Sequence, residues 1–282
     1  MKVLKNLITT LLFYSGVISL FRFVYRNKVI IIYYHKIHPT IFENHVKYLK
    51  KKYTIISLQT FLSNKSKNEK NRLIITFDDG HVDNFKLLPI LKKYSVPITV
   101  FITTGLINTK KGYWFSLEGL TNPIKKMLKT LSDEQRLSYL KENFDYSDEK
   151  NFDSPQSLSI TQIENMSEWV DFQSHTITHP CLIRCNAEKS LLEISGSKLE
   201  LEKITGKEVN TLAFPNGDYS EREVEFALNS GYKCLMSGIP GVNNTKKNMV
   251  VMFRNSTGDT SNTHELALRV VGLWFMVRKL FK

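Results

Sequence analysis

Two adjacent aspartates follow a run of strand-forming residues early in the chain. Residues 73–77 (LIITF) have almost no polar face, which indicates a strand buried on both sides, as in a parallel sheet. Asp78 and Asp79 come directly after this run, and Gly80 permits a tight turn. Because active sites of α/β barrels and open α/β sheets lie at the carboxyl ends of the strands, we predict that these two carboxylates belong to an active site.

A second group of metal-ligand side chains lies in SHTITHP, at residues 174–180. His175 and His179 follow a brief predicted strand, and two imidazoles with one carboxylate suit zinc or a similar divalent ion. Asp79 can supply that carboxylate, and a bound metal would lower the pKa of water to about 7. Asp78 would then take the proton of that water as general base. Either motif alone is often an ordinary turn or helix face, so the prediction rests on the two together.

The rest of the chain alternates between predicted strands and helices, which is the βαβ pattern of an α/β protein. Polar residues from about 106 to 155 interrupt this alternation and show a helical pattern, so we predict an insertion there. Residues 249–253 are predicted to form the last strand and to bring Arg254 to its end. The other predicted strands cover residues 29–34, 53–57, 97–102, 170–173, 211–214 and 232–236.

TFDDG at residues 76–80, followed by SHTITHP, resembles the first two motifs of the polysaccharide deacetylases, the NodB-homology or carbohydrate esterase family 4 enzymes. The resemblance runs over about residues 30–255. It implies a distorted (β/α) barrel in which Asp78 is the base and Asp79, His175 and His179 hold the metal. The implied reaction is hydrolysis of acetyl groups from N-acetylated, less often O-acetylated, sugars.

The third motif of the family departs from its usual form. Family members carry R-x-P-Y/F-G, in which the N–H after the proline stabilises the oxyanion. Here AFPNG keeps Pro215 and Gly217, places Asn216 at the donor position and has Ala213 where arginine is expected. We therefore predict that Arg254 replaces the missing arginine beside the base.

The leaving amine needs a proton donor, and no L-x-x-H motif is present near the carboxyl terminus. IYYHKI at residues 32–37 resembles the early segment of the branch that deacetylates poly-N-acetylglucosamine, which implies that His35 is the general acid. A histidine buried in the core at a strand end is the alternative. Trp114 is predicted to line the substrate groove, with a packing role as the alternative, because aromatic faces stack on sugar rings.

Both ends of the chain are basic and amphipathic. Residues 1–28 contain an apolar run between lysines and arginines without an A-x-A-like cleavage site. We predict a membrane-associating helix there, either an uncleaved anchor or an interfacial helix, and a second amphipathic helix at residues 261–282. A helix packed on the domain surface is the alternative. The formal charge of +12 fits anionic lipid better than nucleic acid, since no nucleic-acid-binding motif is present.

Together these features predict a bacterial, membrane-associated deacetylase with its catalytic domain at residues 29–260. One divalent ion is expected, zinc first, with cobalt or nickel as alternatives. The expected substrate is an N-acetylated sugar of a surface polysaccharide or of its lipid-linked precursor. A deformylase or O-acetyl esterase acting on a lipid-linked sugar, and a non-catalytic carbohydrate-binding protein with the same fold, are the competing hypotheses. Three cysteines without CxxC spacing are predicted to be reduced structural thiols.

Overall fold

A parallel sheet forms the centre of the protein. This computed structural model describes residues 2–244 and 249–279, and the strand order is β8-β7-β6-β5-β4-β3-β1-β9, with β2 beside β3. The strands are β1 (Val29–Tyr34), β2 (Thr54–Ile55), β3 (Arg72–Phe77), β4 (Ile98–Ile102), β5 (Val170–Ser174), β6 (Thr211–Ala213), β7 (Cys234–Met236), β8 (Val251–Met252) and β9 (Asn255–Ser256).

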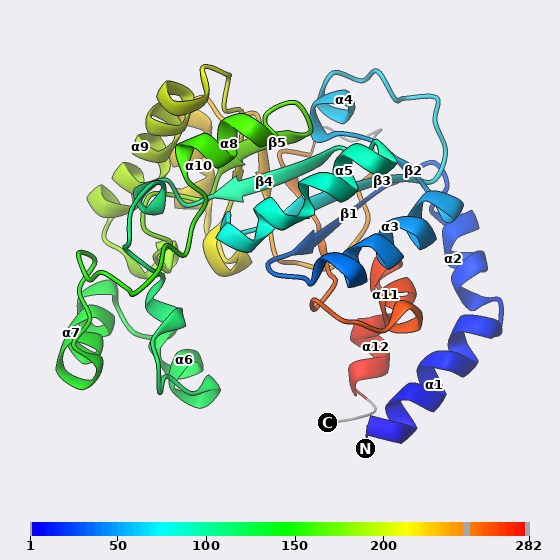
Figure 1. Cartoon of the computed structure of the whole chain (residues 1–282), viewed down its shortest axis with the longest axis horizontal. Coiled ribbons are helices and arrows are strands. Elements are labelled where there is room, and N and C mark those ends of the chain that lie inside the picture. Colours follow the sequence, from blue (N-terminus) through cyan, green and yellow to red (C-terminus); the bar gives the residue numbers. More distant parts are fainter. Residues whose placement is uncertain (1, 245–248, 280–282) are drawn as a thin grey trace.

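The sheet curls until its two ends approach each other (Figure 1). β8 pairs with β7, whereas β9 pairs with β1 at the opposite end of the strand order. Only Phe253 and Arg254 separate β8 from β9, so one short run of chain connects both ends of the sheet. The predicted distorted (β/α) barrel is therefore confirmed. The strand expected at 249–253 is present as β8, but the prediction that it is the last strand is wrong, because β9 follows it and Arg254 lies between the two.

Helices surround the sheet in the order expected of βα units (Figure 1). The long helix α9 shows why they form: the Asn186 side chain accepts a hydrogen bond from the N–H of Lys189 at its start, and Gly206 ends it with a φ of 64°. The helices outside the insertion and the termini are α3 (Pro39–Lys52), α4 (Leu58–Leu62), α5 (Leu88–Tyr94), α8 (Ile160–Met166), α9 (Ala187–Thr205) and α10 (Glu221–Asn229), with 3-10 turns η1 (Val82–Leu87), η2 (Thr104–Leu106), η4 (Leu182–Arg184) and η5 (Pro215–Gly217).

Strand register places the chemical side chains at one level. Tyr34 of β1 aligns with Phe77 of β3, so His35 and Asp78 leave neighbouring strands side by side. All residues of β3 and β4 are buried, as the continuous apolar runs predicted. The carboxyl ends of the strands therefore lie at one end of the barrel, where the motifs meet.

The predicted insertion contains α6 (Asn122–Leu128), α7 (Asp133–Phe144) and the 3-10 turn η3 (Trp114–Ser116). These elements share a small apolar cluster of their own, separate from the main core. Cys181, which follows the histidine motif, belongs to this cluster and joins the insertion to the barrel. The insertion is thus packed against the loop that bears His179.

Each terminal segment forms two helices instead of the single helix predicted. α1 (Lys2–Tyr14) and α2 (Val17–Val24) are separated at Gly16, whose φ is 83°, and α11 (Thr263–Val270) and α12 (Trp274–Lys279) at Gly272, whose φ is 77°. A left-handed glycine interrupts the helical hydrogen bonds in both places. Residues 280–282 of the helix predicted at 261–282 lie outside the described residues.

The N-terminal helices pack on the C-terminal ones. Lys5 pairs with Glu265 at 2.8 Å, and Thr10 lies 3.1 Å from His264. Ile18 is buried in an apolar cluster with residues of α11 and α12. Among the described residues, no single helix is long and apolar enough to cross a membrane, although α1 and α2 pass that test together despite a 57° bend.

Candidate active site

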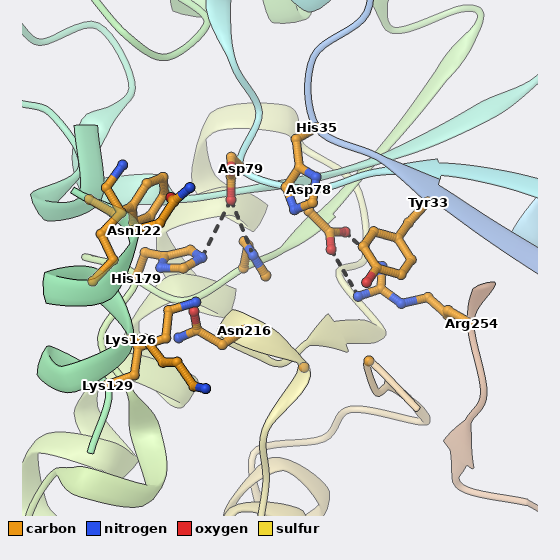
Figure 2. A pocket seen from close by; sticks show the side chains of 15 residues that line it. Tyr33, His35, Asp78, Asp79, Asn122, Lys126, Lys129, His179, Asn216 and Arg254 are labelled. Atoms are coloured by element: carbon orange, nitrogen blue, oxygen red, sulfur yellow. Dashed lines mark hydrogen bonds and ion pairs between the residues drawn. The ribbon is translucent and has the colours of Figure 1, made fainter. Parts of the chain in front are cut away.

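A pocket of about 480 Å³ opens at the carboxyl ends of the strands (Figure 2). Most of the predicted site residues line it: His35, Asp78, Asp79, His175, His179, Asn216 and Arg254. The other two, Pro215 and Trp114, are buried and do not belong to its lining. Residues from five separate parts of the sequence thus meet around one cavity.

The three residues predicted to bind a metal ion converge in this pocket. Oδ1 of Asp79 lies 3.5 Å from Nε2 of His175 and 3.4 Å from Nε2 of His179. One ligand atom from each residue lies within 4.8 Å of the other two, and all three residues are buried. A carboxylate with two imidazoles is a donor set that suits zinc and leaves positions for water and substrate. The residues therefore fit the expected divalent ion.

The orientation of His175 is set by a backbone contact. Its Nδ1 lies 2.7 Å from the carbonyl oxygen of Ala213 in β6, and only a protonated Nδ1 can donate to that oxygen. This tautomer leaves the lone pair of Nε2 pointing toward Asp79. The alanine that replaces the motif arginine therefore still contributes its carbonyl to the site.

The loop that bears His179 is attached to α9 by Glu193. Its carboxylate accepts hydrogen bonds from the N–H groups of Ile177 and Thr178, both at 2.8 Å, and from the Thr178 hydroxyl at 2.5 Å. Glu193 is 4% exposed, so these bonds replace its lost hydration. Burial raises the pKa of Glu193, and the three hydrogen bonds oppose that effect. Sequence reasoning missed this residue because it looks like any glutamate of an amphipathic helix.

Several residues at the site have left-handed backbone conformations. The φ angles are 72° at Asp79, 68° at Thr176, 59° at His179 and 59° at Asn216. Such angles cost a residue other than glycine on the order of 1 kcal/mol, and they persist only where surrounding contacts enforce them. The surrounding fold therefore holds these residues in strained positions that the local sequence does not favour.

Asp78 makes a two-pronged ion pair with Arg254. Nη1 and Nη2 of Arg254 donate to the two carboxylate oxygens of Asp78 at 2.6 and 2.9 Å, and both residues are almost fully buried. Nε of Arg254 donates to the carbonyl of Ser237, and its guanidinium stacks over the Tyr33 ring. Burial favours a higher pKa for Asp78, but Arg254, together with His175 and His35, outweighs this effect and lowers the pKa. Arg254 thus keeps Asp78 ionised.

His35 lies on the pocket wall with Asp259 beside it. Oδ1 of Asp259 accepts from the backbone N–H of His35 at 3.1 Å, and Oδ2 lies 3.7 Å from Nδ1 of the ring. Desolvation works to lower the pKa of His35, but the carboxylates of Asp259, Asp79 and Asp78 outweigh it and raise the pKa to about 9. The neighbouring carboxylates therefore favour the protonated imidazole. Sequence reasoning missed Asp259, since a TGD turn far along the chain has no local signature of such a role.

The PNG turn lies on the side of the pocket next to α6. Asn216 and Gly217 line the pocket, and Pro215 is buried behind them. Gly217 has a φ of 75°, and a Cβ there would lie 2.4 Å from the backbone of Gly238. Glycine is therefore required at this position. The turn presents Asn216 to the pocket, as the predicted oxyanion role would need.

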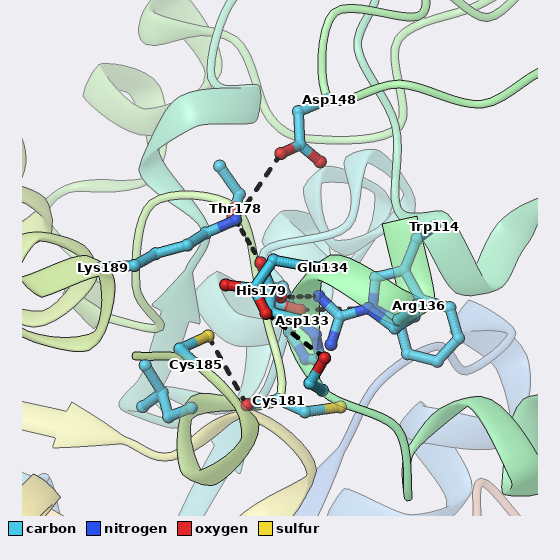
Figure 3. A network of polar contacts seen from close by, with 12 residues as sticks. Trp114, Asp133, Glu134, Arg136, Asp148, Thr178, His179, Cys181, Cys185 and Lys189 are labelled. Carbon is cyan, nitrogen blue, oxygen red and sulfur yellow. Dashed lines mark hydrogen bonds and ion pairs between the residues drawn. The ribbon is translucent and has the colours of Figure 1, made fainter. Parts of the chain in front are cut away.

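Trp114 does not lie in the groove, in contrast to the sequence prediction. It is 2% exposed, its Nε1 donates to the carbonyl of His179 at 3.3 Å, and Arg136 lies over its ring (Figure 3). The insertion buries the indole in its own apolar cluster, which the alternative packing role describes. Its neighbour Phe115 lines the pocket instead, as does Tyr33 of β1.

The three cysteines are free and buried, as predicted. Cys181 lies in the cluster of the insertion, and its sulfur accepts a 3.5 Å hydrogen bond from Asn216. Among the described residues, the cluster that could hold a metal ion consists of Asp79 and the two histidines and includes no cysteine.

Comparison with known proteins extends this picture. The family model described as polysaccharide deacetylase matches residues 65–235, which include Asp78, Asp79 and the histidine motif. The chain belongs to the polysaccharide deacetylase family. His35, Arg254 and Asp259 lie outside the matched residues, and the structure places Arg254 beside Asp78, His35 on the wall of the same pocket and Asp259 beside His35.

Individual relatives are distant. YxkH from Bacillus subtilis (strain 168) is 23% identical over 219 residues, which cover 76% of this chain and 62% of YxkH. The alignment thus spans less than two thirds of that relative.

Solved structures share the deacetylase fold. The Streptococcus pyogenes deacetylase PplD, in complex with acetate, is 21% identical with a TM-score of 0.64, over 87% of this chain and 99% of that one. IcaB from Ammonifex degensii is 15% identical with a TM-score of 0.62, over 87% and 97%. At these identities the similarity supports the fold alone.

Proposed function

We propose that this protein removes acetyl groups from N-acetylated sugars by metal-dependent hydrolysis of the amide bond. The observation that supports the proposal most strongly is the convergence of the Asp79, His175 and His179 cluster with an ionised Asp78 and a protonated His35 in one pocket. Amide hydrolysis needs a base for the attacking water and an acid for the leaving amine. Arg254 favours the ionised form of Asp78, and the carboxylates near His35 favour its protonated form.

Asp79, His175 and His179 would hold one divalent ion, zinc first, with cobalt or nickel as alternatives. When bound, such an ion polarises an acetyl carbonyl and lowers the pKa of water. Asp78 accepts the proton of the attacking water, because Arg254 keeps its carboxylate charged. The backbone N–H of Asn216 is assigned to the developing oxyanion.

His35 donates the proton that the departing amine requires. The C–N bond breaks as this proton is transferred, so the products are acetate and a free amino sugar. The surrounding carboxylates favour the protonated imidazole, and the ring lies 46% exposed on the wall where a sugar nitrogen can reach it.

The substrate we propose is an N-acetylated sugar of a bacterial surface polysaccharide or of its lipid-linked precursor. Residues of both the barrel and the insertion line the pocket, so a bound sugar can contact both. Removal of a formyl group or of an O-acetyl group from a lipid-linked sugar would use the same water, base and metal.

The test is acetate release from N-acetylglucosamine oligomers by the purified protein, with and without a chelator. Asp79→Asn should lose bound metal and activity together, whereas Asp78→Asn should retain metal and lose turnover by about 100-fold or more, the contribution of a general base. Metal content is measured by atomic emission. If neither these oligomers nor formylated or O-acetylated analogues react, the protein is a carbohydrate-binding relative that has lost the reaction.

We also propose that the terminal helices hold the protein at a membrane surface. α1 and α2 turn one face toward the C-terminal helices and leave apolar side chains on the other, with Leu7 55%, Leu11 62% and Phe23 61% exposed. Arg26 lies over the ring of Phe23, and Arg22 and Lys28 are close to it in the sequence. Exposed apolar side chains beside basic residues are typical of helices that lie in the membrane interface.

A further inference from the structure

Three lysines of α6 and its carboxyl end, Lys125, Lys126 and Lys129, line the same pocket as the metal cluster. Figure 2 shows Lys126 and Lys129 beside Asn216 and His179, across the pocket from Arg254. Sequence analysis did not single them out, because a lysine pair in a polar helix resembles any solvated surface. Their place in the lining separates them from the other lysines of this basic chain.

These three ammonium groups have no carboxylate to neutralise them. None of the ion pairs between described residues includes Lys125, Lys126 or Lys129. The two carboxylates of the pocket have other partners, since Asp78 pairs with Arg254 and Asp79 contacts the two imidazoles. A bound divalent ion would add further positive charge to the same cavity.

The helix turns these lysines toward the pocket because its opposite face is fixed. Leu128 is fully buried and Ile124 partly buried in the cluster of the insertion. Lys125 and Lys129 are four positions apart, and Lys126 and Lys129 three, so the ammonium groups share one side of the helix and repel each other. Cations interact favourably with the carboxyl end of a helix, which explains why lysines occur there. That interaction does not explain why these lysines line the pocket.

The insertion itself is attached to the barrel through buried polar contacts (Figure 3). Asp133 and Arg136 of α7 form a buried ion pair, Lys189 of α9 pairs with Asp133 at 2.5 Å, and Arg136 stacks on Trp114. Trp114 in turn donates to the carbonyl of His179. The wall that bears the lysines is therefore fixed relative to the metal cluster.

We infer that the pocket takes an acidic glycan, in which a phosphate ester or a carboxylate lies beside the N-acetylated sugar and contacts these three lysines. This inference deepens the proposed function by naming the charge of the substrate. Lysine binds phosphate and carboxylate groups as a point charge without demanding one orientation, which suits an anion on a flexible sugar chain. An anion there would relieve the repulsion among the three ammonium groups.

The test is a titration of the metal-loaded protein with glucose trisaccharides, which have no acetyl group and are not consumed. Three probes are compared: the neutral trisaccharide, the same chain phosphorylated at either end, and a chain oxidised to a uronic acid. We expect the wild type to bind one or both acidic probes about tenfold more tightly than the neutral one at low salt, since each exposed charge pair contributes modestly. The preference should shrink as salt is raised.

In the triple variant Lys125→Gln, Lys126→Gln, Lys129→Gln, the acidic probes and the neutral probe should have nearly equal dissociation constants. The matched control Lys65→Gln, Lys67→Gln, Lys70→Gln removes the same charge from exposed lysines that precede the amino end of β3, and it should keep the wild-type ratio. Equal binding of all probes by the wild type, a preference that survives in the pocket variant, or an equal loss in the control would overturn the inference. The salt dependence of the wild type serves as evidence even if the pocket variant does not fold.

The outcome is separable from that of the proposed function. Acidic preference without acetate release from any N-acetylated oligomer would retain the lysine site and reject the deacetylase activity. Acetate release without acidic preference would retain the activity and reject the lysine site.

Discussion

At the scale of single residues, two adjacent aspartates have different partners. Asp78 points toward Arg254 and Asp79 toward the imidazoles, which separates the proposed base from the proposed metal ligand within one dipeptide. The left-handed φ of Asp79 turns the chain between them. The sequence predicted a role for each aspartate. The direction in which each side chain points depends on the backbone of the folded chain.

The His35 and Asp259 pair gives a prediction about pH. As the proposed acid, His35 acts in its protonated form, so activity should fall as pH rises through its raised pKa. Asp259→Asn removes a carboxylate that raises this pKa, so the descending limb of the kcat/KM profile should move about one to two pH units lower. Asparagine also tolerates the φ of 46° at this position.

Acetate release between pH 6 and 10 measures this shift. The loss relative to wild type should be large near pH 8 and small near pH 6, because the acid form of His35 is still populated at low pH. A uniform loss across the range would instead indicate that Asp259 only supports the fold of its loop.

At the scale of elements, α9 determines where the second histidine lies. The loop at residues 176–179 has two left-handed residues and is attached through Glu193. The predicted helices and strands located this loop in the sequence. They did not show that α9 holds the loop in place. The contact joins residues 15 or 16 positions apart and depends on α9 packing against β5.

Glu193→Gln should reduce metal affinity by about tenfold, the usual effect of losing a group that orients a metal ligand. Glutamine keeps the volume but loses the charge that binds two N–H groups and a hydroxyl. Metal retained after dialysis against a graded chelator series measures the effect. Glu200→Gln, on an exposed position of the same helix, is the control and should behave as wild type. Equal retention in both variants would contradict the assigned role.

At the scale of the whole molecule, the terminal helices associate with each other and with the barrel. Their inner face is buried with Ile18 and Leu268, which agrees with the surface-packed alternative for residues 1–28. Their outer face keeps the exposed apolar side chains on which the membrane proposal rests. Deleting residues 1–26 would therefore expose the inner face of α11 as well as remove a membrane contact.

Substitution of the outer face is a cleaner experiment. Leu7→Gln with Leu11→Gln should lower the fraction that sediments with phosphatidylglycerol vesicles by about tenfold or more, given the free energy of burying two leucines. Leu191→Gln with Leu192→Gln, two exposed leucines of α9, is the matched control and should sediment as wild type does. Unchanged sedimentation of the first variant would argue against this membrane contact.

The sequence by itself determined the local features. Apolar runs predicted the strands that carry the motifs, since burial on both faces leaves a direct pattern in composition. The two motifs also predicted the metal ligands and the base, because those residue types are rare together at strand ends. The resemblance implied His35 as the acid and led to the expected barrel.

Only the tertiary structure decided which distant side chains complete the site. Arg254 reaches Asp78 because it lies between β8, which pairs with β7, and β9, which pairs with β1. The same closure of the sheet brings Asp259 to His35. Burial of Trp114 and exposure of the α6 lysines to the pocket depend on how the insertion packs. These contacts arise from long-range packing. The spacing of residues along the chain does not predict which side chains are close together in the folded barrel.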